Sequence, residues 1–125
     1  EKTKVIFICS PNNPSANAIP MEQIQILLDQ FSGLVVVDEA YIDFSTKGTA
    51  LKLLNDYPKL MICQTFSKAY GLAGIRLGIG FAHPLIISFF DEKKYFFLLI
   101  MLIRALLFRK TIALYFSWTS FGPLP

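Results

Sequence analysis

Continuous apolar runs constrain the fold of this chain more than any other feature of its sequence. Three of them, at residues 4–10, 34–40 and 59–65, are rich in β-branched and aromatic side chains and end in polar residues. Strands that are apolar throughout, instead of alternating, are typical of sheets with both faces covered. A fourth run, at residues 76–82, is a further expected strand. These runs therefore predict an α/β protein with a mostly parallel sheet flanked by helices.

Two segments between the runs carry helix signals. Pro20 opens a stretch in which apolar residues recur at helical spacing, and these are Ile24, Leu27, Leu28 and Phe31. Gly33 ends this stretch. Residues 49–58 form a shorter candidate helix, which Pro58 stops. The alternation of strands and helices is the rhythm of a doubly wound sheet, in which ligands bind at the carboxyl ends of the strands.

Length, charge and cysteine content exclude several classes of protein. The 125 residues suffice for one domain with a core. A net charge of +3 without a long basic block makes nucleic acid an unfavoured partner. Cys9 and Cys63 lie in apolar runs at a spacing that fits no metal motif, so we expect reduced thiols, a cytoplasmic location and no metal site. The first residues do not resemble a signal peptide and include no initiator Met, so the chain is expected to begin within a longer protein.

Polar and titratable side chains follow three of the predicted strands. They are Asn12 and Asn13, then Asp38, Glu39 and Tyr41, and then Thr65, Ser67 and Lys68. Taken singly, each has an ordinary interpretation as a turn residue, a cap, a half-buried aromatic or a solvated lysine. Together they fit one chemistry: an amine for an aldehyde cofactor, a carboxylate for its pyridine nitrogen, and donors for its ring hydroxyl. Hydroxyls and the guanidinium of Arg76 would suit a phosphate, so the residues indicate pyridoxal phosphate.

Three motifs in order carry a resemblance to a known family. The stretches SPNNPSAN, VVVDEAYIDF and QTFSKAYGLAGIRLG resemble the class I and II aminotransferases, which are pyridoxal-phosphate enzymes of fold type I. Within that family the sequence is most similar to the histidinol-phosphate aminotransferases. The resemblance covers about residues 4–82 and implies a fragment of the large cofactor-binding domain.

The resemblance implies a role for seven residues. Lys68 would bind the cofactor covalently and later move a proton, and Asp38 would pair with the pyridine nitrogen. Tyr41 and Asn13 would both reach the ring hydroxyl. The remaining three would lie near the cofactor phosphate: Thr65, Ser67 and Arg76.

The chain departs from the family in one turn and in what it lacks. The family's Asn-Pro-Thr-Gly turn reads Asn-Pro-Ser-Ala here, and Ala16 matters if that position needs a positive φ. The family's upstream phosphate-binding loop and stacking aromatic, and its downstream substrate-binding arginine, have no convincing match. We therefore expect the chain alone to be inactive and poorly soluble.

The resemblance also implies substrates and an assembly. The family transfers an amino group from a small-molecule donor to a 2-oxoacid, and intact members are homodimers. The implied pair is histidinol phosphate and 2-oxoglutarate, in histidine biosynthesis. Two alternatives stay open: a related fold type I enzyme such as a threonine-phosphate decarboxylase, and a non-enzymatic remnant or membrane-associated pseudo-enzyme.

Residues 85–125 differ in composition from residues 1–84, which we interpret as the partial cofactor-binding domain. The tail is crowded with Phe, Leu and Ile and contains the only Trp. Its apolar run at residues 95–108 is interrupted by Arg104 and is shorter than the roughly 20 residues that a membrane span needs. A reading-frame shift near residue 95 is a more specific interpretation of the tail. Suitable codons for residues 97–103 give, in another frame, the Pro-Pro-Tyr-Asn-Val-Asn string that the family carries near this point.

Overall fold

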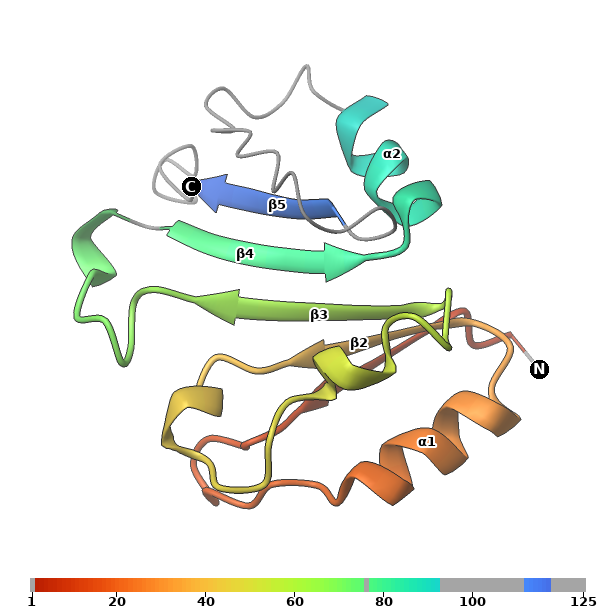
Figure 1. Cartoon of the computed structure of the whole chain (residues 1–125), viewed down its shortest axis with the longest axis horizontal. Coiled ribbons are helices and arrows are strands. Elements are labelled where there is room, and N and C mark those ends of the chain that lie inside the picture. Colours follow the sequence, from red (N-terminus) through yellow and green to blue (C-terminus); the bar gives the residue numbers. More distant parts are fainter. Residues whose placement is uncertain (1, 76, 93–111, 118–125) are drawn as a thin grey trace.

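One mixed sheet organises the described part of the chain. The structure is a computed structural model that describes residues 2–75, 77–92 and 112–117. Its strands, in the spatial order β1-β2-β3-β4-β5 (Figure 1), are β1 Val5–Cys9, β2 Leu34–Asp38, β3 Leu60–Thr65, β4 Leu77–Ala82 and β5 Ile112–Ser117. β1, β2 and β3 are parallel, β4 is antiparallel to β3, and β5 is antiparallel to β4. The predicted, mostly parallel α/β sheet is confirmed for the first three strands.

Helix α1, Met21–Gln30, lies against one face of this sheet (Figure 1). Its buried residues Ile24 and Leu28 contact apolar side chains of β2 and β3, which alternate in direction along each strand. The members of this cluster from the two strands are Val35, Val37, Leu60 and Ile62. The helix predicted from the spacing of apolar residues is therefore confirmed, and it covers the sheet as expected.

The helix predicted over residues 49–58 is wrong in length. The structure has a single 3-10 helix there, η2 Ala50–Leu53, with the side chain of Thr49 accepting a hydrogen bond at its start. Asn55 and Asp56 favour turns over helix, and Pro58 holds the residue before it away from helical geometry. The segment is therefore too short to continue as an α-helix.

Helix α2, Pro84–Glu92, covers the other face. Ile87 is 1% exposed and packs in a second cluster with Val36, Met61 and Ala82. We do not predict this helix from the sequence, because we assign nearly all of its residues to the apolar tail. Within the described residues, no helix is both long enough and apolar enough to cross a membrane. The proposed frame shift near residue 95 lies outside the described residues, and the boundary at residue 84 stays a prediction.

Candidate functional site

The parallel strands bring their polar loops to one end of the sheet. β1, β2 and β3 all end there, and β4 begins there because it runs in the opposite direction (Figure 1). Four of the predicted residues lie in or directly before these loops, and we call them the strand-end cluster: Asn13, Asp38, Tyr41 and Lys68. The prediction that the three strand ends converge is therefore confirmed by the topology.

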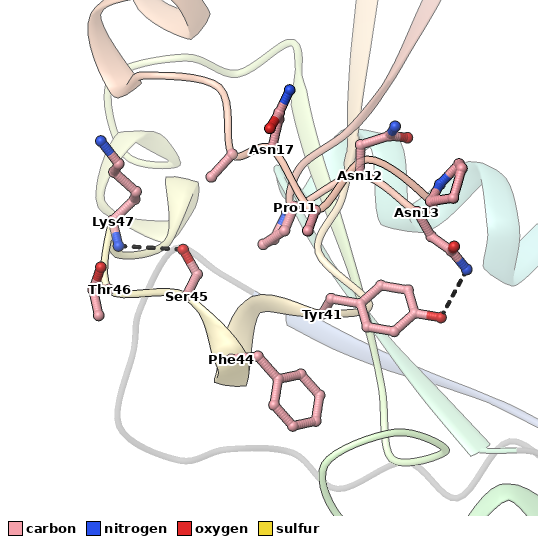
Figure 2. Close-up of a pocket in the computed structure, with 12 residues that line it drawn as sticks. Pro11, Asn12, Asn13, Asn17, Tyr41, Phe44, Ser45, Thr46 and Lys47 are labelled. Atoms are coloured by element: carbon pink, nitrogen blue, oxygen red, sulfur yellow. Dashed lines mark hydrogen bonds between the residues drawn. The ribbon is translucent and has the colours of Figure 1, made fainter.

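Tyr41 is the centre of the cluster. Its hydroxyl accepts a hydrogen bond from Nδ2 of Asn13, at 3.1 Å (Figure 2). Nζ of Lys68 lies over the Tyr41 ring, 5.2 Å from the ring centroid. The backbone of Tyr41 is fixed by the short helix η1, Ile42–Phe44, whose Phe44 N–H donates to the Tyr41 carbonyl at 3.1 Å. Residues from three separate loops therefore meet at one aromatic ring.

Asp38 is the last residue of β2, and its exposed carboxylate belongs to the same end of the sheet. Oδ1 accepts a hydrogen bond from the Ala40 N–H at 3.0 Å, which holds the side chain beside its own turn. Cys9 and Cys63 are its partners in the neighbouring strands. Burial, and to a lesser degree the negative charge of Asp38, raises the pKa of the Cys63 thiol to about 11.

Thr65 organises the turn between β3 and Lys68. Its hydroxyl donates to the Leu77 carbonyl at 3.3 Å and accepts from the Ser67 N–H at 3.1 Å. Gly71, with φ of 67°, closes the following turn by donating its N–H to the Lys68 carbonyl at 3.0 Å. Thr65 and Ser67 are both half-buried at this end of the sheet. Arg76, the predicted phosphate ligand, lies outside the described residues, and a phosphate role for these three residues stays a prediction.

A pocket of about 740 Å³ opens beside the cluster (Figure 2). It lies between residues 11–18 and residues 41–47, and Asn13 and Tyr41 belong to both the pocket and the cluster. Ala16 lines this pocket with φ of 59°, a left-handed conformation that favours glycine. The position where the sequence departs from the family pattern is therefore one that does need a positive φ.

One residue of this region was not assigned a role from sequence. Glu39 appeared there only as one of several polar residues after a strand, yet it is 2% exposed. The signal that could have found it is its position directly after Asp38 at the end of an extended run, since neighbouring side chains along a strand lie on opposite faces of the sheet. Among the described residues, no group of His, Cys, Asp or Glu side chains is arranged to hold a metal ion.

The donor set fits pyridoxal phosphate. A primary amine, a carboxylate and two hydrogen-bonding groups that already contact one another are present at the same end of one sheet. These are the groups that an aldehyde, a pyridine nitrogen and a ring hydroxyl require. Such a ligand would bind where doubly wound sheets bind theirs, at the carboxyl ends of the strands.

Comparison with known proteins places these observations in a family. The sequence profile described as "Aminotransferase class I and II" matches residues 1–115. A histidinol-phosphate aminotransferase of Flavobacterium johnsoniae is 56% identical over 94 residues, which are 75% of this chain and 27% of the relative. A histidinol-phosphate aminotransferase of Parabacteroides distasonis is 54% identical over 95 residues, or 76% of this chain and 28% of the relative. This chain thus spans about a quarter of the length of the curated relatives it matches.

Solved structures give the same result. The histidinol-phosphate aminotransferase of Sinorhizobium meliloti, solved in complex with pyridoxal-5'-phosphate, matches with a TM-score of 0.68 and 31% identity, over 74% of this chain and 26% of that chain. The L-threonine-O-3-phosphate decarboxylase of Porphyromonas gingivalis matches with a TM-score of 0.57 and 28% identity, over 61% of this chain and 24% of that chain.

Proposed function

Because this chain belongs to the class I and II aminotransferase family, we propose that it is part of a pyridoxal-phosphate enzyme that moves an amino group from histidinol phosphate to 2-oxoglutarate. The observation that carries this proposal is the meeting of Asn13 and Lys68 at Tyr41, at the end of the sheet where Asp38 ends β2. The choice of substrate rests on the identity of 50–56% with curated histidinol-phosphate aminotransferases. The threonine-phosphate decarboxylase alternative has weaker support, at 28% identity.

Each residue of the strand-end cluster has one task in this proposal. When bound, pyridoxal phosphate supplies an aldehyde and an electron-withdrawing ring. Nζ of Lys68 would hold the aldehyde carbon covalently and, when free, would carry a proton to and from the reacting carbon. The Asp38 carboxylate keeps a proton on the pyridine nitrogen. The Tyr41 hydroxyl and Nδ2 of Asn13 orient the ring through its hydroxyl group.

The contact between Lys68 and Tyr41 is weak enough for the amine to leave it. A cation over an exposed aromatic ring is stabilised by about 0.5–1 kcal/mol. That is enough to hold the 5.2 Å approach of Nζ to the ring, yet it is much less than a buried ion pair would contribute. The contact therefore keeps the amine near the cluster without fixing it in an ion pair.

We infer that the whole protein works as a homodimer in the cytoplasm. The two free cysteines, Cys9 and Cys63, support a reducing compartment. Because this chain spans about a quarter of its curated relatives, we expect no turnover from the chain alone.

We also propose that the sequence beyond about residue 95 is read in a shifted frame. The alignments to curated relatives extend over 92 to 95 of the 125 residues, which leaves part of the chain unmatched, whereas the family profile matches residues 1–115. Sequencing the gene across the junction tests the idea. It is wrong if the codons of residues 97–103 cannot give Pro-Pro-Tyr-Asn-Val-Asn in another frame.

A chimera tests the proposed reaction. Residues 4–82 of this chain would replace the matching segment of the Flavobacterium johnsoniae relative, which supplies the rest of the fold. We expect the chimera to transfer the amino group of histidinol phosphate to 2-oxoglutarate, and its Lys68→Ala variant to lose at least about 10³-fold in rate. A folded chimera with no transfer, or one that releases CO₂ from O-phosphothreonine instead, would refute the proposal.

A further inference from the structure

Glu39 is a buried carboxylate on the opposite face of the sheet from Asp38. It directly follows β2, and its N–H donates to the Cys63 carbonyl at 2.8 Å, so it continues the strand pairing by one residue. Its side chain contacts Thr49 and Ala50, on the face that α1 and η2 cover. At 2% exposed, it has almost no access to water.

Three donors satisfy this carboxylate. Oε1 accepts from the Ala50 N–H at 2.7 Å, and Oε2 accepts from the Thr49 hydroxyl at 2.6 Å and from Nε2 of Gln64 at 2.8 Å. A buried carboxylate is costly unless hydrogen bonds replace its water, and here each bond is short. Because a buried carboxylate that loses its partners is strongly destabilising, these three bonds hold Glu39 in one arrangement.

The donors belong to the two segments that Glu39 joins. Thr49 and Ala50 begin η2, whereas Gln64 lies in β3, immediately before Thr65 and the turn that carries Lys68. Glu39 itself lies between Asp38 and Tyr41. Its side chain therefore connects the loop after β2, which carries Tyr41, to β3, which leads into the turn that carries Lys68.

We propose that Glu39 is a positioning residue that holds Asp38 and Tyr41 at a fixed place relative to Lys68. The proposal rests on the proposed function, because the property it controls is how tightly the cluster holds pyridoxal phosphate. Glutamine is a poor replacement for Glu39: with its oxygen on the Ala50 N–H, its NH₂ faces Thr49 and Gln64, which must both change from donor to acceptor and lose the carboxylate they now bind. Exchanging the two residues, in the double variant Glu39→Gln with Gln64→Glu, restores a donor opposite an acceptor.

The first experiment needs no cofactor. Amide hydrogen exchange in the 125-residue chain reports two hydrogen bonds to Asp38. The Ala40 N–H donates to Oδ1 of Asp38, and the Ser10 N–H donates to the Asp38 carbonyl. We expect Glu39→Gln to accelerate exchange of both amides by about tenfold, with the amides of α1 unchanged, and the double variant to reverse this. The proposal is overturned if only the Ala50 amide, which Glu39 binds directly, exchanges faster.

The second experiment measures the site itself. Reduction with borohydride makes the bond between pyridoxal phosphate and a lysine permanent. Peptide mapping then gives the concentration of pyridoxal phosphate at which half of the Lys68 side chains are labelled. We expect this concentration to rise about tenfold in Glu39→Gln and to return to within about threefold of the parent in the double variant. Tyr57→Phe, which removes the distant bond to Asp29, is the control for lost stability.

The outcomes separate the two proposals. An unchanged half-saturation in Glu39→Gln, or an equal rise in Tyr57→Phe, overturns the role of Glu39. If Glu39→Gln does not fold, Gln64→Leu removes one donor and must weaken labelling in the same direction, or the role is again overturned. If the parent chain shows no labelling of Lys68, the proposed function fails, and the exchange rates of the Ala40 and Ser10 amides alone decide the role of Glu39.

Discussion

Ala16 occupies a backbone conformation that suits glycine. Its φ of 59° lies in the left-handed region, and its N–H closes the turn by donating to the Asn12 carbonyl at 2.7 Å. A side chain in this region costs about 1–2 kcal/mol, part of which the greater freedom of an unfolded glycine offsets. The turn is therefore formed in spite of its residue at this position.

We expect Ala16→Gly to raise the free energy of unfolding by about 0.5–1 kcal/mol, as measured by urea denaturation. Ala18→Gly is the matched control, because Ala18 lies in the same loop and its φ is not positive. That variant should lose stability by about 0.5 kcal/mol. Equal effects of the two substitutions would show that the φ of Ala16 carries no strain.

Cys63 makes the stability of the fold depend on pH. Its pKa is raised to about 11, first by burial and then by the charge of Asp38, whereas an exposed thiol titrates near 8.5. Between these values the unfolded chain has lost the proton and the folded chain keeps it. The thiol's contribution is therefore complete below about pH 8.5 and declines as the pH rises toward about 11.

This predicts slow alkylation of Cys63 by iodoacetamide until the pH approaches about 11, measured in a Cys9→Ser background that removes the other thiol. Asp38→Asn should lower the midpoint, because it removes the second cause of the shift. A midpoint near 8.5 in the folded protein, or no response to Asp38→Asn, would contradict the placement of these two residues.

At the scale of elements, the joint between α1 and β2 depends on a residue without a side chain. A Cβ on Gly33 would collide with the Lys4 carbonyl oxygen and with the ring of Phe31. Because the carbonyl belongs to the backbone, the collision can be relieved only by moving β1 relative to the joint.

Gly33→Ala is therefore expected to destabilise the fold by about 1–3 kcal/mol in urea denaturation. Gly74→Ala serves as the control, since nothing lies within 4 Å of the added Cβ there. It should change stability by no more than about 0.5 kcal/mol. If the two variants unfold at the same urea concentration, the close approach at Gly33 is not real.

The edge strand β1 explains the expected poor solubility. β1 is the first strand in the sheet order, and Phe7 in its middle is 78% exposed. An open edge with an exposed aromatic residue invites pairing with other chains. We expect Phe7→Lys to increase the soluble fraction after centrifugation, and Ile26→Lys, on the exposed surface of α1, to increase it much less. Equal gains would show that general hydrophobicity, and not the edge, causes aggregation.

The sequence predicts some elements of this fold much better than others. β1, β2 and β3 are readable because each is a short apolar run followed by polar residues, and parallel pairing then places Asn13, Tyr41 and Lys68 together. Helix α2 and strand β5 are missed, because the composition of residues 85–125 predicts an apolar tail outside the domain and not further elements of the sheet. The sequence also does not show that Glu39 is buried, because its burial depends on which face of the sheet η2 packs against.

At the scale of the whole molecule, this chain contains the strand-end cluster but is much shorter than its curated relatives. It spans about a quarter of its curated relatives, yet both faces of the central strands are packed, by Leu28 of α1 and by Ile87 of α2. The strand-end cluster is built on these packed strands. We therefore expect site-selective binding of pyridoxal phosphate by this chain even where turnover is absent.

Selective covalent capture at Lys68 is the most direct test of the whole account. The 125-residue chain would be incubated with limiting pyridoxal phosphate, reduced with borohydride, digested and analysed by mass spectrometry. The account predicts the label on Lys68 ahead of the other exposed lysines, such as Lys47 and Lys52, and loss of this preference in Asp38→Asn. Labelling that follows exposure alone, with Lys68 no more reactive than Lys47, or no labelling at all, would contradict it.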